Sequence, residues 1–398
     1  MSSFSLTRRE FLSAALLTPA FARQAPPGAR FIGTVPLGNP GGLSTPPFGR
    51  LLGSGLDARR FTDLALLGGS AGNQESAVHT APSAIGGSSS ASLVTPNDRF
   101  FVRTASPSPL PPADAWSIRI GGLVEAPREV RLADLERHIA PGGRYLIECS
   151  GNADQRNYGL MSTADWDGVP LATLLDRVRP SAPVYRVLVS GLDPAASSRT
   201  SVAGASWIFS RDDLQRALLA VRMNGAPLPR DHGAPVRLIV PGWYGCVCIK
   251  WIDRVELVTD EAAATAQMRE FAARTHQDPR VSLARDFTPA LIDTAAMPVR
   301  VEKWLIEGRV VYRVTGIVWG GSKPTDALSI RFKSTQPWVP VDDCPMPSST
   351  LTWSLWSHTW RPDAPGRYQI VLRVDDPTIR TRRLDIFFYV REIEIDQV

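Results

Sequence analysis

Hydrophobic side chains in the middle of the chain recur with the periods expected of strands and of short helices. Residues 116–120 alternate between apolar and polar side chains before a pair of glycines, which predicts a strand that ends in a turn. Residues 144–148 form another short strand pattern, which runs directly into Cys149. Leucine and valine within residues 171–178 follow the spacing of one helix face. We therefore expect an α+β domain of mixed strands and helices over residues 95–294.

Further elements are predicted in the second half of this domain. A serine and two aspartates at residues 210–213 form a capping box, which predicts a helix that continues through residues 214–219. Residues 236–240 and 247–258 have the apolar runs of strands. Residues 259–294 are polar and rich in alanine, which indicates a helix and a linker.

The pattern changes near residue 297 to short alternating runs separated by glycine, proline and aspartate. These runs are residues 299–305, 310–318, 328–332, 351–356, 368–374 and 384–393. Such spacing is typical of an all-β sandwich. Six of the eleven tryptophans lie in this region, which has no obvious nucleophile or metal-ligand cluster. We expect residues 295–398 to be a packing or dimer-forming module.

Two segments of different character precede these domains. Residues 23–94 are rich in glycine, proline and serine, which predicts an extended arm that wraps the main domain or is partly disordered. Residues 1–22 contain paired arginines, then Phe11 and Leu12, an apolar stretch, and a small–x–small cleavage site. This segment resembles a twin-arginine signal, and an ordinary secretory leader is the alternative. A twin-arginine signal implies a periplasmic protein that is exported already folded, commonly because it carries a cofactor.

Composition narrows the function classes. The chain has 398 residues, 43% hydrophobic and 21% charged, which suits two domains with real cores and excludes wholesale disorder. The formal net charge of +5 is not gathered into a basic run, which argues against nucleic-acid binding. The four cysteines are too few for a dense disulfide framework, and the sequence has no motif for covalent haem attachment. It also has no apolar run long enough to span a bilayer.

Three short patterns match known sites without the required context. Residues 53–58 fit the dinucleotide pattern G-x-G-x-x-A but follow a Pro/Gly-rich stretch instead of a strand. Residues 68–72 fit the G-x-S-x-G elbow around Ser70, but the polar residues that follow are a poor start to a helix. The five histidines lack the H-x-x-x-H spacing of a zinc site. These patterns give little support to a dinucleotide-binding protein, a serine hydrolase or a zinc enzyme.

Longer segments carry a more specific signal. They are residues 95–103, 148–152, 161–171, 223–237 and 241–251. Through the order and spacing of these segments, residues 90–398 resemble the sulfite oxidase family of molybdopterin-dependent oxidoreductases. The resemblance implies a molybdopterin-binding mixed α/β domain followed by an immunoglobulin-like β-sandwich that forms a homodimer.

Cys149 is the central candidate residue. It follows a predicted strand and begins a Ser-Gly-Asn loop, where a side chain can point into a cleft. A soft thiolate is a suitable ligand for thiophilic molybdenum, whereas a lone cysteine outside such a motif is usually a buried core residue. The resemblance implies that Cys149 is the protein ligand to the metal.

A pterin with its phosphate requires cations and hydrogen-bond donors. The resemblance implies a cofactor site made by Asn97, Phe101, Val102, Arg103, Asp193, His232, Arg237, Cys248, Ile249 and Lys250. The residues themselves leave alternatives open, because Asp193 can initiate a turn and His232 can be a surface turn residue. If this segment is a strand, the side chains of Cys246, Cys248 and Lys250 share one face. The two cysteines could then form a Cys-x-Cys metal site, or they could be two small buried thiols.

The chain departs from the family pattern around the expected substrate. The family has arginine soon after the cysteine loop, where this chain has Ala153 and Asp154, and the next arginine is Arg156. Phe271 stands where the family has a catalytic tyrosine. The expected catalytic set is Cys149, Arg103, Arg156 and Tyr158, with Tyr244 and Trp166 as further residues that could orient a ligand.

The resemblance implies a periplasmic enzyme with a molybdenum–molybdopterin cofactor that transfers an oxygen atom to a small anionic sulfur compound. Oxidation of sulfite to sulfate is the leading expectation. We expect no haem or flavin in the chain, so electrons should pass to an external acceptor such as a c-type cytochrome. The alternatives are another substrate, as in a sulfane dehydrogenase or a sulfoxide reductase, and a non-catalytic binding protein of the same fold.

Overall fold

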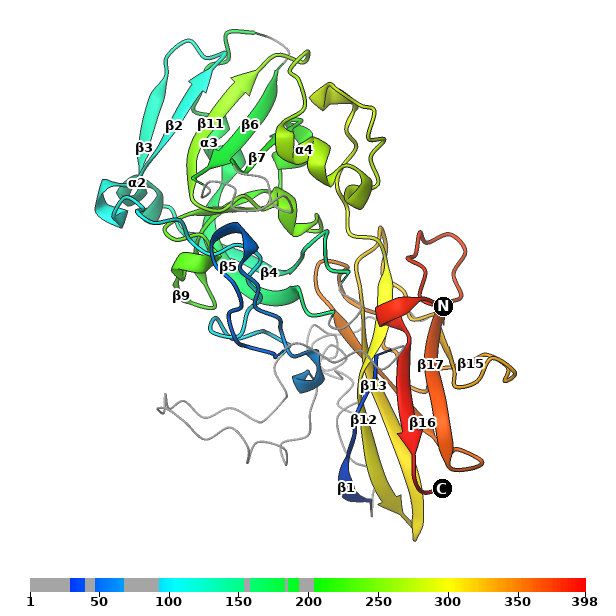
Figure 1. Cartoon of the computed structure of the whole chain (residues 1–398). Helices are drawn as coiled ribbons and strands as arrows, with labels where there is room; N and C mark the ends of the chain where they lie inside the picture. Colours follow the sequence, from blue (N-terminus) through cyan, green and yellow to red (C-terminus); the bar gives the residue numbers. More distant parts are fainter. Residues whose placement is uncertain (1–28, 40–46, 68–92, 154–157, 183–184, 193–203) are drawn as a thin grey trace, which may run out of the picture.

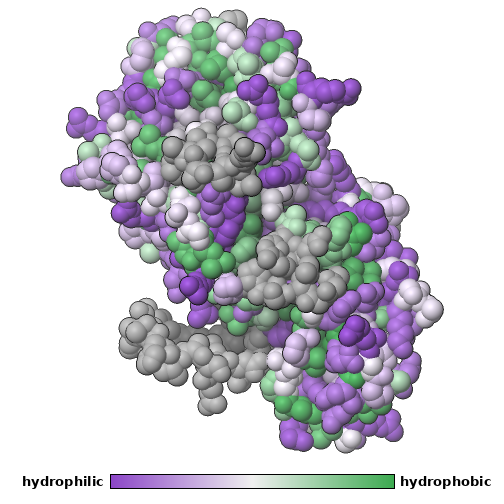
Figure 2. Space-filling view, in the orientation of Figure 1, coloured by the Kyte–Doolittle hydropathy of each residue, from purple (hydrophilic) through white to green (hydrophobic). Residues whose placement is uncertain are grey.

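The structure is a computed structural model in which residues 29–39, 47–67, 93–153, 158–182, 185–192 and 204–398 are described. Figure 1 shows two parts, a mixed α+β part drawn in cyan to green and a sandwich of long strands drawn in yellow to red. Hydrophilic and hydrophobic side chains are interspersed over the face of both parts that Figure 2 presents. Among the described residues, every helix is too short to cross a membrane.

The α+β part contains two five-stranded sheets. One has the order β10-β8-β5-β4 with β9 paired to β8, and the other has the order β3-β2-β11-β6-β7. The strands are β2 (Ser117–Gly122), β3 (Arg128–Arg131), β4 (Ala140–Glu148), β5 (Met161–Pro170), β6 (Arg186–Gly191), β7 (Ser206–Phe209), β8 (Leu218–Met223), β9 (Ala226–Pro227), β10 (Arg237–Ile239) and β11 (Ile252–Val258). The short helices are α2 (Leu132–Glu136), α3 (Leu171–Leu175) and α4 (Ala266–Phe271). The expected α+β class is confirmed, as are the strand patterns at residues 116–120 and 144–148 and the helix pattern at residues 171–178.

One cluster of buried side chains holds the two sheets together. Trp166, Trp207 and Trp251 are at its centre, each no more than 1% exposed. Strand β4 enters this cluster gradually, because its first residues are exposed and its last three are buried. The strand therefore delivers Cys149, the next residue, to the interior of the domain.

The second part is a β-sandwich. Its sheets have the orders β1-β12-β13-β16 and β15-β14-β17-β18. The strands are β1 (Arg30–Val35), β12 (Ala295–Ile306), β13 (Arg309–Trp319), β14 (Leu328–Arg331), β15 (Val339–Pro340), β16 (Ser354–Trp360), β17 (Gly366–Val374) and β18 (Arg391–Ile395). Both sheets contribute side chains to one core, which includes Trp319, Trp353, Trp356 and Trp360. The predicted sandwich is present, whereas its immunoglobulin-like character and its role in dimerisation stay predictions.

The arm before residue 95 contacts both parts. Strand β1 pairs with β12 along the edge of the sandwich, where Figure 1 draws it in blue. Further along, Arg60 and Val102 exchange backbone hydrogen bonds of 2.8 and 3.1 Å in the α+β part. Arg300 of the sandwich then donates to the carbonyl of Leu67 at 2.7 Å. The arm was expected to wrap the main domain, and its described residues do so only in part, because β1 belongs to the sandwich.

The helix predicted over residues 214–219 is wrong. The capping contacts are present, since Ser210 and Asp213 accept each other's backbone N–H at 3.2 and 2.8 Å, but they cap only the 3-10 turn Asp212–Leu214. The chain then forms β8, which lies between β10 and β5 and is buried at nearly every position. A strand buried on both faces lacks polar alternation, so its sequence cannot be distinguished from a buried helix by period alone.

Two predicted strands start later than expected. The strand predicted over residues 247–258 begins at Ile252, because Gly245–Val247 forms a 3-10 turn. Cys246, Cys248 and Lys250 therefore do not share a strand face. The run at residues 384–393 becomes a strand only at Arg391, after another 3-10 turn.

Candidate active site

Cys149 lies at the end of β4 in a tight loop. Its side chain is 7% exposed, and its backbone N–H donates to the carbonyl of Leu160 at 2.9 Å. The carbonyl of Cys149 accepts the N–H of Asn152 at 2.9 Å, and the Gly151 N–H points to the sulfur at 3.4 Å. A Cβ at Gly151 would lie 3.7 Å from this sulfur. The loop thus fixes the thiol and keeps the space beside it small.

One cavity collects most of the predicted cofactor residues. Its walls include Cys149, Phe101, Arg103, His232, Arg237, Cys248, Ile249 and Lys250. Phe271, which replaces the family's tyrosine, also lines it, as does Cys246. Seven of the predicted cofactor residues therefore line the same cavity as Cys149, the candidate metal ligand.

The remaining predicted residues lie elsewhere. Asn97 is behind the wall, where its carbonyl is 3.1 Å from Nε2 of His232. Val102 is 1% exposed and pairs with the arm. Asp193 and Arg156 lie outside the described residues, as do Asp154, Ser70 and the signal-like segment at residues 1–22.

His232 and Arg237 form a buried polar wall. His232 is 2% exposed, so it is not the surface turn residue that the sequence allowed. Burial, reinforced by the charges of Arg237 and Lys250, lowers the pKa of His232 to about 3, so its imidazole is neutral. Because Nε2 faces a carbonyl, this nitrogen carries the proton and Nδ1 is left as an acceptor.

Arg237 is anchored by one side of its guanidinium. It donates to the carbonyls of His232 and Cys248 at 3.0 and 3.2 Å, and it lies over the ring of Trp166. Burial lowers its pKa to about 10, so it remains charged at neutral pH. Its Nε is buried without a hydrogen-bond partner among the described residues. A buried donor without a partner is costly, so this wall fits a ligand that supplies acceptor atoms, as a pterin or its phosphate does.

Lys250 adds a second fixed cation. Its Nζ donates to the carbonyls of Thr104 and Asp231 at 2.5 and 2.9 Å, and it lies 4.3 Å from the ring centre of Trp251. A guanidinium, an ammonium and an imidazole thus converge on the cavity beside the thiol of Cys149. This set of donors, with one soft ligand, fits a molybdenum held mainly by a pterin dithiolene.

Three arginines surround Cys149. Arg103 lines the cavity together with Cys149; burial lowers the Arg103 pKa, and the nearby Cys149 opposes this effect. Arg59 lies close enough to Arg103 that burial and then this like charge lower its pKa to about 10. Arg274 is exposed, but its Nη1 lies 3.4 Å from where a Cβ on Gly151 would be, and it stacks on Phe271. The site is therefore strongly cationic.

Arg59 and Arg274 were missed by the sequence reasoning. Arg59 lies in the Gly/Pro-rich arm, and Arg274 lies in the segment interpreted as a linker. Only the spacing of Arg274 three residues after Phe271 could have suggested that the two share a helical face. No local pattern could have suggested Arg59.

Tyr158, predicted as catalytic, is not on the cavity wall. Its side chain is 1% exposed, and its hydroxyl donates to Glu148 at 2.5 Å. The Tyr158 hydroxyl thus contacts Glu148, the residue before Cys149, and neither Glu148 nor Tyr158 lines the cavity. Trp166 is also fully buried, under Arg237, and Tyr244 is 4% exposed beside Arg382. The structure does not bring these three aromatic residues to the ligand-facing surface of the cavity.

The alternative of a Cys-x-Cys metal site gains no support from the described residues. No group of three or more histidine, cysteine, aspartate or glutamate side chains among them could hold a metal. Cys248 accepts the backbone N–H of Val240 at 3.5 Å, and burial raises the pKa of both Cys246 and Cys248. Buried thiols of raised pKa are poor thiolate ligands at neutral pH.

Comparison with known proteins gives independent information on this site. Residues 105–266 match the family model for the oxidoreductase molybdopterin binding domain. The mitochondrial sulfite oxidase of Rattus norvegicus is 25% identical over 288 residues, which are 67% of this chain and 52% of that protein. The NADH nitrate reductase 1 of Nicotiana tabacum is 31% identical over 190 residues, 43% of this chain and 21% of that protein. The chain spans about half the length of the sulfite oxidase that it matches.

A solved structure extends the similarity to the whole fold. The sulfane dehydrogenase SoxCD of Paracoccus pantotrophus superposes with a TM-score of 0.60 over 90% of this chain and 94% of that chain. The sequence identity is 18%, so this similarity concerns the fold. It includes residues of both the α+β part and the sandwich, since neither part alone amounts to that share of the chain.

Proposed function

The chain belongs to the sulfite oxidase family of molybdopterin-dependent oxidoreductases, and on this premise we propose that it oxidises a small sulfur oxyanion, with sulfite as the leading substrate. The reaction converts sulfite and water to sulfate, two protons and two electrons. The observation that carries the proposal is one cavity lined by Cys149, Arg103 and the cofactor-type wall, with Arg59 held against Arg103 and Arg274 beside Gly151.

In this proposal the residues of the chain have separate tasks. Cys149 binds the molybdenum, and Arg237, His232 and Lys250 bind the pterin and its phosphate. When bound, the cofactor supplies oxygen-atom transfer and accepts the two electrons. His232 presents a neutral Nδ1 acceptor, while the two cations provide the charge that a phosphate requires.

The arginines support an anionic substrate. Arg103 lines the cavity with Cys149, Arg59 donates to the carbonyl of Arg103, and Arg274 lies beside Gly151. Charge-assisted hydrogen bonds from guanidinium groups fit the geometry of oxyanions. Arg274 thus supplies the cation that the family places directly after the cysteine loop, where this chain has Ala153. The guanidinium carbon of Arg274 lies over the ring of Phe271, 5.5 Å from the ring centre, which favours this position of the cation.

A second candidate function is sulfane dehydrogenation. It is favoured by the similarity of fold to a protein named sulfane dehydrogenase and by the lack of a phenol at Phe271. Steady-state rates with sulfite, with thiosulfate and with a protein-bound persulfide, each with cytochrome c as acceptor, would distinguish the two candidate functions. A molybdenum-loaded protein that is inactive on sulfite but active on the persulfide would replace the leading proposal.

Location and partners form the remaining part of the proposal. The paired arginines within residues 1–22 support twin-arginine export of the folded enzyme to the periplasm. There an external c-type cytochrome would receive electrons, and the sandwich would join two copies. Fractionation of cells that express the full chain tests the location, and light scattering of the purified protein tests the homodimer.

The defining experiment is elemental analysis of protein made in a host that synthesises molybdopterin. About one molybdenum per chain is expected, as one cavity with one soft ligand implies. Protein that matures without molybdenum would favour the non-catalytic binding protein over the enzyme. Protein that contains molybdenum but does not oxidise sulfite would contradict the substrate assignment and leave the cofactor assignment in place.

A further inference from the structure

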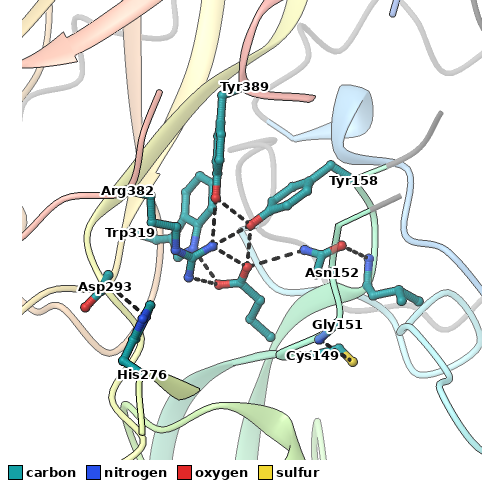
Figure 3. A network of polar contacts seen from close by, with 11 residues as sticks. Cys149, Gly151, Asn152, Tyr158, His276, Asp293, Trp319, Arg382 and Tyr389 are labelled. Atoms are coloured by element: carbon teal, nitrogen blue, oxygen red, sulfur yellow. Dashed lines mark hydrogen bonds and ion pairs between the residues drawn. The ribbon is translucent and has the colours of Figure 1, made fainter. Parts of the chain in front are cut away.

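The carboxylate next to Cys149 lies in a buried network that spans both parts of the molecule. Glu148 precedes Cys149 and is 1% exposed. Arg382 donates to its two oxygens at 2.7 and 2.8 Å, and Trp319 donates to one of them at 2.9 Å. Both donors belong to the sandwich, whereas Glu148 and Tyr158, which donates at 2.5 Å, belong to the α+β part. Figure 3 shows these contacts, with Cys149 below and to the right of them.

Arg382 is held in place independently of Glu148. Its backbone N–H donates to the carbonyl of Thr294 at 3.0 Å. Its Nη1 donates to the hydroxyls of Tyr158 and Tyr389 at 2.5 and 3.0 Å. Its guanidinium also lies 5.5 Å from the ring centre of Tyr244. A side chain held at this many points has one position, so Arg382 fixes the Glu148 carboxylate relative to the sandwich.

The metal-ligating loop is tied to the same carboxylate. The Asn152 side chain donates to Glu148 at 3.4 Å and accepts the N–H of Leu160 at 3.0 Å. The backbone of Asn152 donates to the carbonyl of Cys149 at 2.9 Å. Glu148 and Asn152 therefore bracket Cys149 on both sides along the chain, and both are anchored on the network.

The charge balance of the network favours the ionised pair. Arg382 donates to both carboxylate oxygens of Glu148 inside the protein, and such a two-point contact with a guanidinium favours the ionised carboxylate. Removing either partner leaves a buried charge without its counter-ion, which forces the surroundings to rearrange. The rearrangement would begin one peptide bond from the sulfur of Cys149.

We propose that Arg382 is a positioning residue through which the sandwich fixes Glu148 and, with it, the Cys149 sulfur relative to the metal. This inference rests on the proposed cofactor. It gives the sandwich a role in the metal site of its own chain, in addition to any role in joining two copies. Residues that orient a metal ligand affect metal affinity and the electronic properties of the metal, and a purely structural contact affects only stability.

Glu302 provides a matched control. Like Glu148, it is 1% exposed and accepts hydrogen bonds from an arginine and from an indole. The donors are Arg300 at 2.9 Å and Trp304 at 3.1 Å. It lies in β12, within the sandwich, and is not part of the cavity wall. Glu302→Gln and Glu148→Gln therefore remove the same charge from the same kind of environment, and only one of them is next to Cys149.

The test uses the molybdenum-loaded full chain and two measurements besides activity. We expect Glu148→Gln and Arg382→Met to shift the Mo(V) electron paramagnetic resonance spectrum and to lose molybdenum on dialysis about tenfold faster than wild type. We expect Glu302→Gln to keep the wild-type spectrum and metal retention even though its melting temperature falls.

Milder variants keep the test decisive if these proteins do not fold. Arg382→Lys keeps the charge but not the paired donors, and Trp319→Phe removes the indole hydrogen bond while keeping an aromatic ring at this buried position. Each is expected to produce a smaller shift in the same direction. Wild-type spectra and metal retention in every foldable network variant would overturn the inference.

The two levels of proposal fail differently. A wild-type protein without molybdenum overturns the cofactor assignment and this inference with it. A wild-type protein with molybdenum that does not oxidise sulfite overturns only the substrate. Unshifted variants of a molybdenum-loaded protein overturn only the role of Arg382.

Discussion

Arg59 donates from Nη1 to the backbone carbonyl of Arg103 at 2.8 Å, which brings two half-buried arginines from distant segments together near Cys149. Burial and then the charge of Arg103 lower the pKa of Arg59 to about 10. Folding therefore holds like charges together where an anion would relieve the repulsion. This arrangement has no use in a packing core and is expected at an oxyanion site.

Sulfate should therefore stabilise the protein. A ligand that binds only the folded state, present at 100 times its dissociation constant, stabilises by about 2.7 kcal/mol, and the melting temperature should rise accordingly. Differential scanning calorimetry with sodium sulfate, against sodium chloride at equal ionic strength, measures the effect. Arg103→Met should remove the difference between the two salts. An equal response of the wild type to both salts would contradict an oxyanion site.

Arg274→Met should weaken sulfite binding without loss of the cofactor. A hydrogen bond to a charged group contributes about 1.5–3 kcal/mol, so KM should rise by about tenfold or more. Arg274→Lys should recover part of this loss, because it restores charge but not the planar donor. Arg269→Met is the matched control, since Arg269 is exposed in the neighbouring helix α4 but, unlike Arg274, is not among the residues beside Gly151 or over the Phe271 ring. Equal KM values for the two methionine variants would exclude Arg274 from the site.

His232 should make stability depend on pH. Its pKa is lowered to about 3 in the folded state, against an ordinary value of 6.5. Below pH 6.5 the unfolded chain binds a proton that the folded protein does not, so stability is complete above this pH and falls as the pH decreases toward 3. Between pH 8 and pH 5 this one group should reduce the free energy of unfolding by about 2 kcal/mol.

Urea unfolding at both pH values measures this contribution. His232→Gln retains a side-chain donor for the carbonyl of Asn97 but has no group that titrates in this range. The wild type should lose about 2 kcal/mol more than this variant on acidification. Identical losses would show that the imidazole is not shielded as the structure indicates.

The sequence was sufficient to predict elements whose pattern reflects one-sided burial. Residues 116–120 and the approach to Cys149 alternate or end in a buried run, and they are strands. Period alone failed for β8, which is buried on both faces. The period also failed at Cys246. The neighbouring valines suggest a strand there, but Gly245–Val247 forms a 3-10 turn.

The site was predicted where its residues lie in long motifs and missed where they do not. Cys149, His232 and Arg237 lie in such motifs, and they meet at one cavity. Arg59 reaches Cys149 only because the arm crosses back over the domain, which depends on contacts distant in sequence. Tyr158 was predicted as catalytic because it is near Cys149 along the chain. Its hydroxyl instead donates a hydrogen bond to Glu148, away from the cavity.

X-ray absorption at the molybdenum edge, on wild type and Cys149→Ser of comparable melting temperature, tests the ligand assignment most directly. In the serine variant, molybdenum should have one sulfur neighbour fewer, and all turnover of sulfite should be lost. The same number of sulfur neighbours in both proteins, or undiminished turnover in the variant, would contradict this assignment.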